Sequence, residues 1–336
     1  MRKFGFLLLF IVIPKSFSQA SDFKNINFSR ADLIAKTYQS KNLNDLNKLT
    51  SNLTKKLDTD VEKFRAIYIW ITHNIANDFR LYAKNHRKRK RFKNDSIKLE
   101  KWNSRFKNIL FKKLLKRKRT ICTGYAYLLK EMCASVGIKS IMVNGSGRTS
   151  TMDVEDLAYA NHTWNLVKLN NKWYLCDPTW STGISYPEDG KFIFNYDNGY
   201  FLTEPKIFFF NHFPVVPEHS LLAPNMPSFN EFVEKPVLYA KGYTILSDHI
   251  SPKKMYHEVR RNEEFTFQYL LKKEIDLKKV KFVFTNNVSE KTVKPMVSLN
   301  DSLLTLKHTF KKRGFYDVHF YLDNDIIATY TFKILK

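Results

Sequence analysis

Two runs of aromatic and β-branched residues around an Asn-Asn pair constrain the fold of this chain more than any other feature. The runs read HTWNLVKL and KWYLC, and Asn170 and Asn171 stand between them. Asparagine tolerates the positive φ values that a two-residue hairpin turn requires. The pattern therefore predicts an antiparallel hairpin in which Leu169 faces Lys172, and this pair fixes the register of the remaining residues.

The predicted register places a histidine and an aspartate on the same face of the hairpin. Trp164 is expected to face Asp177, and His162 lies two residues before Trp164, so its side chain points to the same side. His162 and Asp177 thereby become diagonal neighbours within reach of each other. A carboxylate in that position holds the orientation and tautomer of an imidazole and stabilises its charged form.

Cys122 supplies a candidate nucleophile for this pair. It stands at the start of a segment whose apolar residues recur at helical spacing, TICTGYAYLLKEMCASVG. A helix N-terminus favours the thiolate, a nearby imidazolium lowers the pKa of the thiol further, and the backbone N–H of Cys122 can stabilise an oxyanion. A cysteine alone is more often a buried small side chain. With His162 and Asp177 placed independently, the nucleophile is the favoured interpretation.

Other residues that could carry chemistry are expected to be structural. Cys133 lies far along the same predicted helix, and a disulfide between Cys133 and Cys176 stays open. His212 lies between Phe210 and Phe213 in an aromatic stretch and is interpreted as a hydrogen-bonded core histidine. The tryptophans of the hairpin region are assigned to packing. No group of His, Cys, Asp or Glu has the spacing of metal ligands, so neither a metal nor a cofactor is predicted.

The first residues have the pattern of an export signal. Arg2 and Lys3 precede a short apolar run at residues 4–13, and small residues at Ser16 and Ser18 suit cleavage. We therefore expect a signal peptide at residues 1–18 and a secreted or periplasmic protein. The apolar run is too short to span a bilayer, and no later segment approaches the roughly 20 residues required.

Most of the positive charge lies in one segment. Residues 80–119 contain 18 lysines and arginines against Asp95 and Glu100, a net charge of +16. Such a segment could contact an acidic envelope polymer or a membrane surface, and the competing interpretation is a solvated surface of a lysine-rich protein. No nucleic-acid-binding motif accompanies the charge, so no specific nucleic-acid partner is predicted. Within the segment we expect an exposed basic loop at residues 87–94 and an amphipathic helix from about Ile97.

The remaining patterns predict two domains. Thr59 and Glu62 fit a capping box at the start of a core helix. Beyond a proline-rich stretch, short alternating runs such as EFTFQYLL and KVKFVFT indicate an all-β domain of the immunoglobulin-like sandwich type, with Tyr316 in a tyrosine-corner-like position. We expect a linker with short helices at 19–57, an α+β domain at 58–222 and the β domain at 235–336.

Several of these segments together resemble a known family. The sequences IYIWITHNIAND, TICTGYAYLL and NHTWNLVKLNNKWYLCDPTW resemble the transglutaminase-like superfamily of papain-type folds, and FLTEPKIFFFNHFPVVPEHSLL resembles the kyphoscoliosis-peptidase-like branch. The resemblance implies that Cys122 is the nucleophile, His162 the general base and acid, and Asp177 the residue that orients His162.

The expected function is that of an exported thiol enzyme acting on peptide or protein amide bonds through a thioester acyl-enzyme. Hydrolysis, as by a protease or amidase, is preferred to amine crosslinking, because water is the default acceptor. The alternative is a non-catalytic module that binds the envelope or another protein through residues 80–119 and the immunoglobulin-like domain. The residues leave this alternative open.

Overall fold

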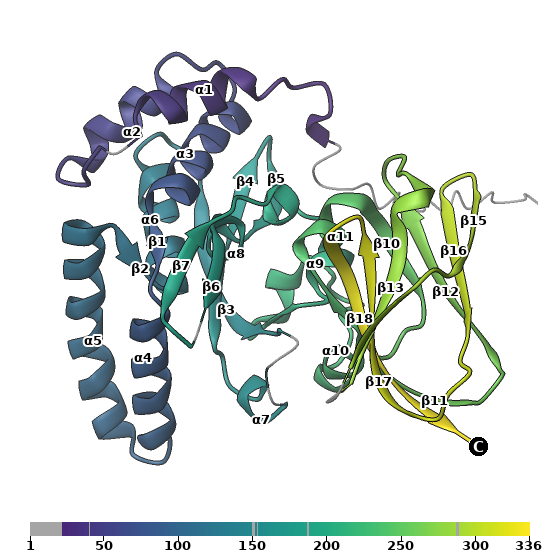
Figure 1. Cartoon of the computed structure of the whole chain (residues 1–336). Coiled ribbons are helices and arrows are strands. Elements are labelled where there is room, and N and C mark those ends of the chain that lie inside the picture. The colour runs from purple at the N-terminus through teal and green to yellow at the C-terminus, as the bar shows by residue number, and fades with distance from the viewer. Residues whose placement is uncertain (1–21, 40, 150–151, 153, 187, 287–288) are drawn as a thin grey trace, which may run out of the picture.

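The structure is a computed structural model that describes the chain except residues 1–21, 40, 150–151, 153, 187 and 287–288. The expected signal peptide at 1–18 lies outside the described residues. Two units lie side by side, an N-terminal unit of helices and short sheets and a C-terminal β unit (Figure 1). In the part of the chain that the structure describes, no helix combines the length and the apolarity needed to cross a bilayer.

The N-terminal unit alternates helices with short strands. Its helices are α1 (Ser29–Thr37), α2 (Leu46–Thr54), α3 (Asp60–Asn74), α4 (Phe79–Arg91), α5 (Ser96–Arg117), α6 (Cys122–Ala134), α7 (Val154–Leu157), α8 (Pro178–Thr182) and α9 (Pro205–Phe208). Its strands are β1 (Ala76–Asn77), β2 (Arg119–Thr120), β3 (Ser140–Gly147), β4 (His162–Leu169), β5 (Lys172–Cys176), β6 (Gly183–Tyr186), β7 (Lys191–Phe194) and β8 (His212–Pro214). The central sheet has the order β5-β4-β3-β8.

Helix α3 is the centre of this unit. The capping box predicted at its start is confirmed, because Thr59 accepts from the backbone of Glu62 and the Glu62 carboxylate accepts from the backbone of Thr59. Helices α1 and α2 pack on α3, and Leu49 and Leu53 join the same apolar core. Of residues 19–57, expected to be a linker with short helices, the helices α1 and α2 are therefore part of this folded unit.

The hairpin prediction is confirmed in its turn and in its register. Asn170 and Asn171 both have positive φ values, 47° and 63°, and Leu169 pairs with Lys172. The ladder of β4 and β5 continues to the pair of Asn165 and Cys176. The chain then leaves the sheet, so Asp177 becomes the N-cap of α8 instead of a strand residue.

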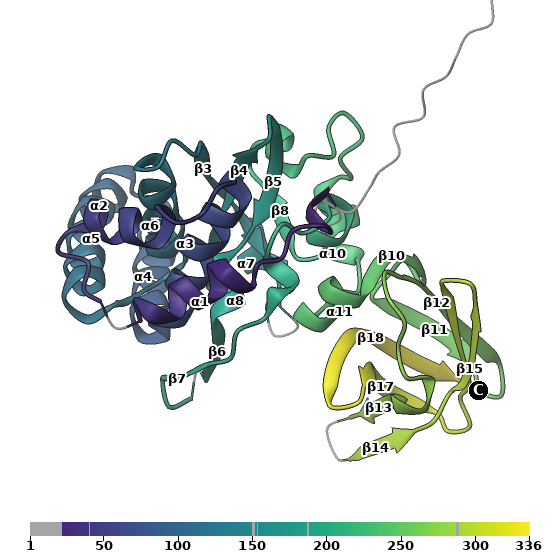
Figure 2. The same cartoon turned by 90° about the horizontal axis from the view of Figure 1, so that it is seen from above.

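The basic segment forms a helical hairpin of α4 and α5 beside the central sheet (Figures 1 and 2). The exposed loop expected at residues 87–94 is wrong over its first half, because α4 continues to Arg91. Lysine and arginine are good helix formers, and the apolar side of the hairpin buries Leu81 against Trp102 and Phe106. A hydrogen bond of 2.9 Å from Trp102 Nε1 to Asn85 Oδ1 also joins the two helices.

The C-terminal unit consists of two packed sheets, with α10 (Phe229–Glu234), β9 (Val237–Leu238) and α11 (Ala240–Ile245) leading into it. One sheet has the order β10-β12-β16-β15 and the other β11-β18-β17-β13-β14, with β9 paired to β18. The strands are β10 (Leu246–Ser251), β11 (Tyr256–Arg260), β12 (Glu264–Leu271), β13 (Val280–Thr285), β14 (Glu290–Val293), β15 (Met296–Asn300), β16 (Leu303–Thr309), β17 (Gly314–Leu322) and β18 (Asp325–Leu335).

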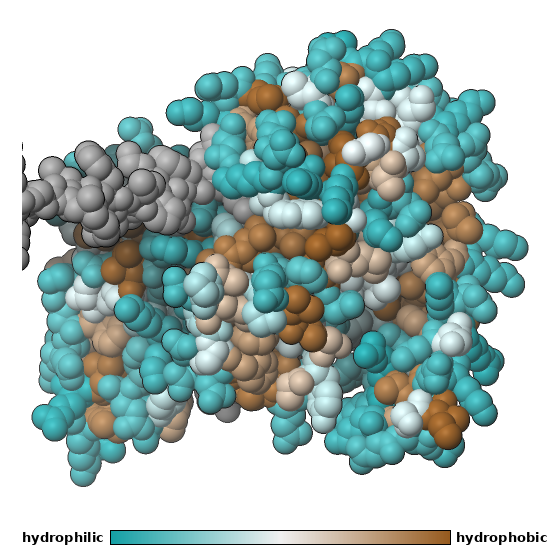
Figure 3. Space-filling model, turned by 180° about the vertical axis from the view of Figure 1, so that it is seen from behind, coloured by the Kyte–Doolittle hydropathy of each residue, from teal (hydrophilic) through white to brown (hydrophobic). Residues whose placement is uncertain are grey.

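One apolar cluster extends through both units. Trp164 and Phe208 of the first unit belong to the same buried cluster as Tyr243 of α11 and Phe267 of the β unit. Arg148 fastens the connection, because its buried guanidinium donates to the backbone carbonyls of Phe232 and Val233 at 2.6 and 2.9 Å and also to that of Lys235. On the face drawn in Figure 3, hydrophilic side chains cover much of the surface, and apolar patches lie among them.

Candidate active site

The structure brings Cys122, His162 and Asp177 together from three elements. Cys122 is the first residue of α6, His162 the first residue of β4, and Asp177 the N-cap of α8. Their exposed fractions are 7%, 8% and 0%. Two connections hold the elements in place: Asn165 of β4 donates to the backbone carbonyl of Ala126 in α6 at 3.0 Å, and β5 pairs with β4.

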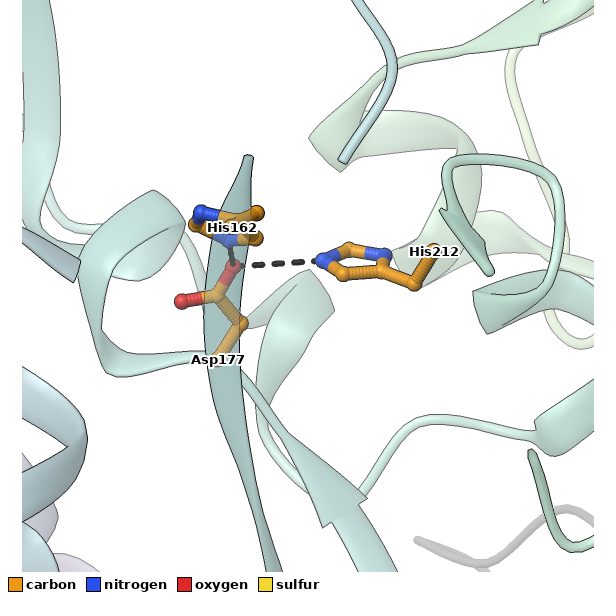
Figure 4. Close-up of side chains that lie close together, drawn as sticks. All are labelled: His162, Asp177 and His212. Carbon is orange, nitrogen blue, oxygen red and sulfur yellow. Dashed lines mark hydrogen bonds and ion pairs between the residues drawn. The ribbon is translucent and has the colours of Figure 1, made fainter. Parts of the chain in front are cut away.

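The Asp177 carboxylate is held by donors on both of its oxygens. His162 Nε2 lies 2.6 Å from Oδ2, while Oδ1 accepts from the backbone N–H groups of Thr179 at 2.8 Å and Trp180 at 3.2 Å (Figure 4). Tyr68 of α3 donates to the backbone carbonyl of Asp177 at 2.9 Å. The core helix therefore fixes the backbone that carries the carboxylate, and a fully buried charge keeps its hydrogen-bond partners.

The imidazole of His162 is held in place by the stacked ring of Trp180 and by close packing against Gly147. The ring of Trp180 stacks on it with the centroids 4.8 Å apart and the planes 23° apart. On the neighbouring strand, a Cβ added to Gly147 would lie 2.7 Å from His162 Cβ and 2.9 Å from its Cγ. Only glycine leaves the space that this ring position requires.

Cys122 and His162 line the same cleft, and each of them shifts the pKa of the other. Because Nε2 is engaged by Asp177, Nδ1 is the ring nitrogen left for the thiol. Among the described residues no side chain caps α6, and the N–H groups of Gly124 and Tyr125 donate to the Ile121 carbonyl, so the N–H groups of Cys122 and Thr123 are the ones left at the helix start. The structure thus places a thiol, a ring and a carboxylate in series.

The electrostatics favour a charged pair. Burial raises the pKa of the Cys122 thiol, but the hydrogen bond and the charge of His162 lower it by more, so this pKa lies below the ordinary value. Burial lowers the pKa of His162, yet the charge and the hydrogen bond of Asp177 outweigh it and raise that pKa to about 10. This arrangement favours a thiolate beside an imidazolium at a lower pH than an isolated thiol would require. By contrast, burial raises the pKa of Cys133 and of Cys176.

Sequence reasoning missed the second histidine of the site. His212 of β8 is buried, and its Nε2 lies 3.2 Å from Asp177 Oδ2, the oxygen that His162 also contacts (Figure 4). Its Nδ1 lies 3.2 Å from the Phe208 carbonyl, but a neutral imidazole has one N–H and donates to only one of these two acceptors. His212 is thus a core histidine as expected, and the site carboxylate is one of its neighbours. The local signal could not reveal this, because β8 pairs with β3 from more than 60 residues away.

His162, Asp177 and His212 are also the described residues whose donor atoms converge in the manner of metal ligands. The sequence spacing did not reveal this convergence. The 2.6 Å between His162 Nε2 and Asp177 Oδ2 is a hydrogen-bond distance. Two ligands of a tetrahedral zinc ion with bonds of about 2.0 Å lie roughly 3.3 Å apart. The group is therefore arranged as a hydrogen-bonded set.

A cleft of about 860 Å³ leads to the sulfur and the imidazole. Its lining includes Cys122 and His162, the inner side of α4, the segment of α7, and residues 215, 216 and 219. Helix α4 thus brings part of the basic segment to the cleft that contains Cys122. The three cysteines are free thiols, and of these Cys122 is the one that lines the cleft.

The buried Cys-His-Asp set has its cysteine at a helix start, its histidine on the first strand of an antiparallel hairpin and its aspartate directly after the second strand, which is the arrangement of a candidate thiol site. Residues 47–178 match the family model of the transglutaminase-like superfamily, and this core of the chain belongs to that superfamily. Within it, similarity to the kyphoscoliosis peptidases supports the branch of those proteins for the matched part of the chain.

The relatives that support this branch are longer proteins. Kyphoscoliosis peptidase of Homo sapiens is 32% identical over 227 residues, which cover 66% of this chain and 31% of that protein. The protein of the same name from Mus musculus is 33% identical, covering 61% of this chain and 28% of that protein. Hillarin of Drosophila melanogaster is 22% identical and covers 59% and 23%. This chain thus spans about a third or less of the length of these relatives.

Among solved structures, the Lin-41 filamin domain covers 26% of this chain and 90% of its own length, with 12% identity and a TM-score of 0.20. A likeness at that score carries no argument. The description of the β unit therefore rests on its own strand order.

Proposed function

We propose that this chain is a thiol enzyme that transfers the acyl group of peptide or protein amides through Cys122. The observation that carries the proposal is the buried series of Cys122, His162 and Asp177 at the base of an open cleft. Cys133 and Cys176 are also buried, but they have raised pKa values and do not line the cleft. Membership of the transglutaminase-like superfamily supports the same reading.

In the proposed reaction, the Cys122 thiolate attacks the amide carbonyl carbon and forms a C–S bond. The backbone N–H of Cys122, at the start of α6, stabilises the resulting oxyanion. His162 gives its proton to the leaving amine as the C–N bond breaks, which leaves a thioester. Water then adds to the thioester while His162 takes a proton, and the C–S bond breaks to give a carboxylic acid. Asp177 stays ionised throughout and orients His162.

The first test uses 4-nitrophenyl acetate, an activated acyl donor that needs no substrate recognition. We expect a burst of nitrophenol and one acetyl group that peptide mass mapping assigns to Cys122, because its thiol has a lowered pKa and lines the cleft. The Cys122→Ala variant should lose the burst, and Cys133→Ala, the matched control, should keep it. Equal acetylation of Cys122→Ala and wild type would remove the basis of the proposal. Adding an amine acceptor then measures the share of transamidation against hydrolysis, and hydrolysis is expected to dominate.

We propose that the β unit is an immunoglobulin-like domain that flanks the cleft domain or binds a partner. The orders β10-β12-β16-β15 and β18-β17-β13-β14 correspond to the A-B-E-D and G-F-C-C′ sheets of that fold. Tyr316, near the start of β17, donates to the backbone carbonyl of Arg313 at 3.1 Å, as a tyrosine corner does.

We further propose export of the chain, since residues 1–18 have the pattern of a cleavable signal. The second candidate function is a non-catalytic module that binds an acidic polymer or a membrane surface through residues 80–119. The observation that favours it is the outward basic face of α5, where lysines such as Lys101 and Lys107 are exposed. This candidate would be favoured if wild type showed no acyl transfer and if Cys122→Ala bound the acidic polymer or membrane surface as well as wild type does.

A further inference from the structure

One wall of the cleft is formed by basic side chains of α4 and its C-terminal end. His86, Arg89, Lys90 and Lys93 all line the cavity that contains Cys122. They recur at helical spacing, so they share one side of the helix. The charge of residues 80–119 is therefore distributed on two faces, one toward solvent and one toward the site.

This wall already binds one carboxylate of the chain. Asp156 of α7 lies 3.4 Å from Lys90 Nζ and 3.8 Å from His86 Nε2. Arg89 and Lys93 line the same cavity, and within the described residues neither has a carboxylate at ion-pair distance. Glu155 is the other acid of the cleft lining, and it stands on α7 with Asp156. Two cations are thus available for a carboxylate that enters the cleft.

The cleft also has an apolar portion. Tyr159, Val215 and Val216 line it with exposed fractions of 63%, 65% and 43%. Large apolar side chains that stay exposed beside a reactive group are typical of binding sites. The cleft that contains Cys122 therefore offers both basic and apolar contacts.

We propose that the acyl donor is an acidic peptide segment. Its carboxylates lie along Arg89 and Lys93, an apolar residue packs on Val215 and Val216, and the amide that reacts is placed at Cys122. This inference rests on the proposed acyl-transfer function and adds the class of substrate. Exposed charge pairs contribute modestly to affinity, so the effect is a preference that salt weakens.

The test compares two double variants of equal charge change. Arg89→Glu with Lys93→Glu reverses the cleft wall, and Lys101→Glu with Lys107→Glu reverses the outer face of α5. Both are made in the Cys122→Ala background, so that binding is measured without reaction. The ligands are three fluorescent peptides that share a central glutamine and leucine and differ in their flanking residues, which are Glu, Gln or Lys. We expect roughly tenfold tighter binding of the Glu peptide at low salt, lost in the cleft variant and kept in the outer-face variant.

Three outcomes would overturn the inference. These are no preference for the Glu peptide, equal loss of preference in both double variants, or a preference that 0.5 M salt does not weaken. Equal loss, together with equal loss of binding to vesicles containing anionic lipid, would mean that the hairpin attracts acidic surfaces as a whole. Acetylation of Cys122 by 4-nitrophenyl acetate is measured in the same double variants with Cys122 intact. Because that donor is uncharged, its reaction reports on the proposed function separately from substrate preference.

Discussion

At the scale of single residues, one buried carboxylate governs the charge of two histidines. His162 and His212 both contact Asp177 Oδ2, but one negative charge balances one proton. Burial lowers the pKa of His212 to about 4, and repulsion from charged His162 acts in the same direction against the attraction of Asp177. His162 keeps the proton, with its pKa at about 10. His212 is therefore a neutral positioning residue that donates from Nε2 to the carboxylate.

Replacement of His212 by leucine is expected to remove one donor from Asp177 and to weaken the hold on His162. We expect acetylation of Cys122 to slow by about tenfold and the free energy of unfolding at pH 7.5 to fall by about 1–3 kcal/mol. Glutamine, whose amide nitrogen can occupy the place of Nε2, should restore most of the rate. A merely structural role would predict loss of stability with an unchanged rate.

The free energy of unfolding at acid pH provides a second test of the role of His212. The folded pKa of His212 is depressed, so its contribution is present above its unfolded pKa of about 6.5 and is lost as the pH falls toward 4. Wild type should therefore lose stability to urea between pH 6.5 and 4. The loss should be smaller in His212→Gln, which has no such titration. If the free energy of unfolding fell by the same amount between pH 6.5 and 4 in wild type and in His212→Gln, a neutral buried His212 would be contradicted.

At the scale of elements, the local sequence pattern correctly predicted those features that depend on contacts between residues close together in the chain. The Asn170–Asn171 turn, the register of β4 and β5, and the capped start of α3 follow from turn chemistry, alternation and capping, which act within a few residues. The helical course of α4 through Arg91 was missed, because its stability depends on apolar contacts with α5. Likewise β8, which carries His212, owes its place to pairing with β3.

The position of the His162 ring depends on the absence of a side chain at Gly147 of β3. Replacement of Gly147 by alanine places a Cβ within 2.7 Å of His162 Cβ, so the ring must shift away from Asp177 or Cys122. We expect acetylation of Cys122 to fall by at least tenfold and the free energy of unfolding to fall by about 1–3 kcal/mol. The matched control is Gly242→Ala in α11, where a Cβ would lie 2.9 Å from the Ile327 carbonyl oxygen, away from the site. Equal rates in the two variants would show that the ring does not depend on this glycine.

At the scale of the whole molecule, the two units share one apolar cluster and a junction fastened by Arg148. The alternating patterns predicted where each unit lies along the chain. They gave no sign that Trp164 of the hairpin packs in the same cluster as Tyr243 and Phe267, because such contacts join residues about 80 to 100 positions apart.

The pH dependence of Cys122 alkylation by iodoacetamide tests the central claim most directly, because only the thiolate reacts. The Cys122 pKa is lowered and that of His162 is raised to about 10, so the alkylation rate of wild type should rise with a midpoint below the ordinary thiol pKa of about 8.5. In His162→Gln, which cannot hold the imidazolium charge, the rate should rise with a midpoint at or above the ordinary thiol pKa of about 8.5. A wild-type midpoint near 8.5, unchanged in His162→Gln, would contradict a thiolate-imidazolium pair at this site.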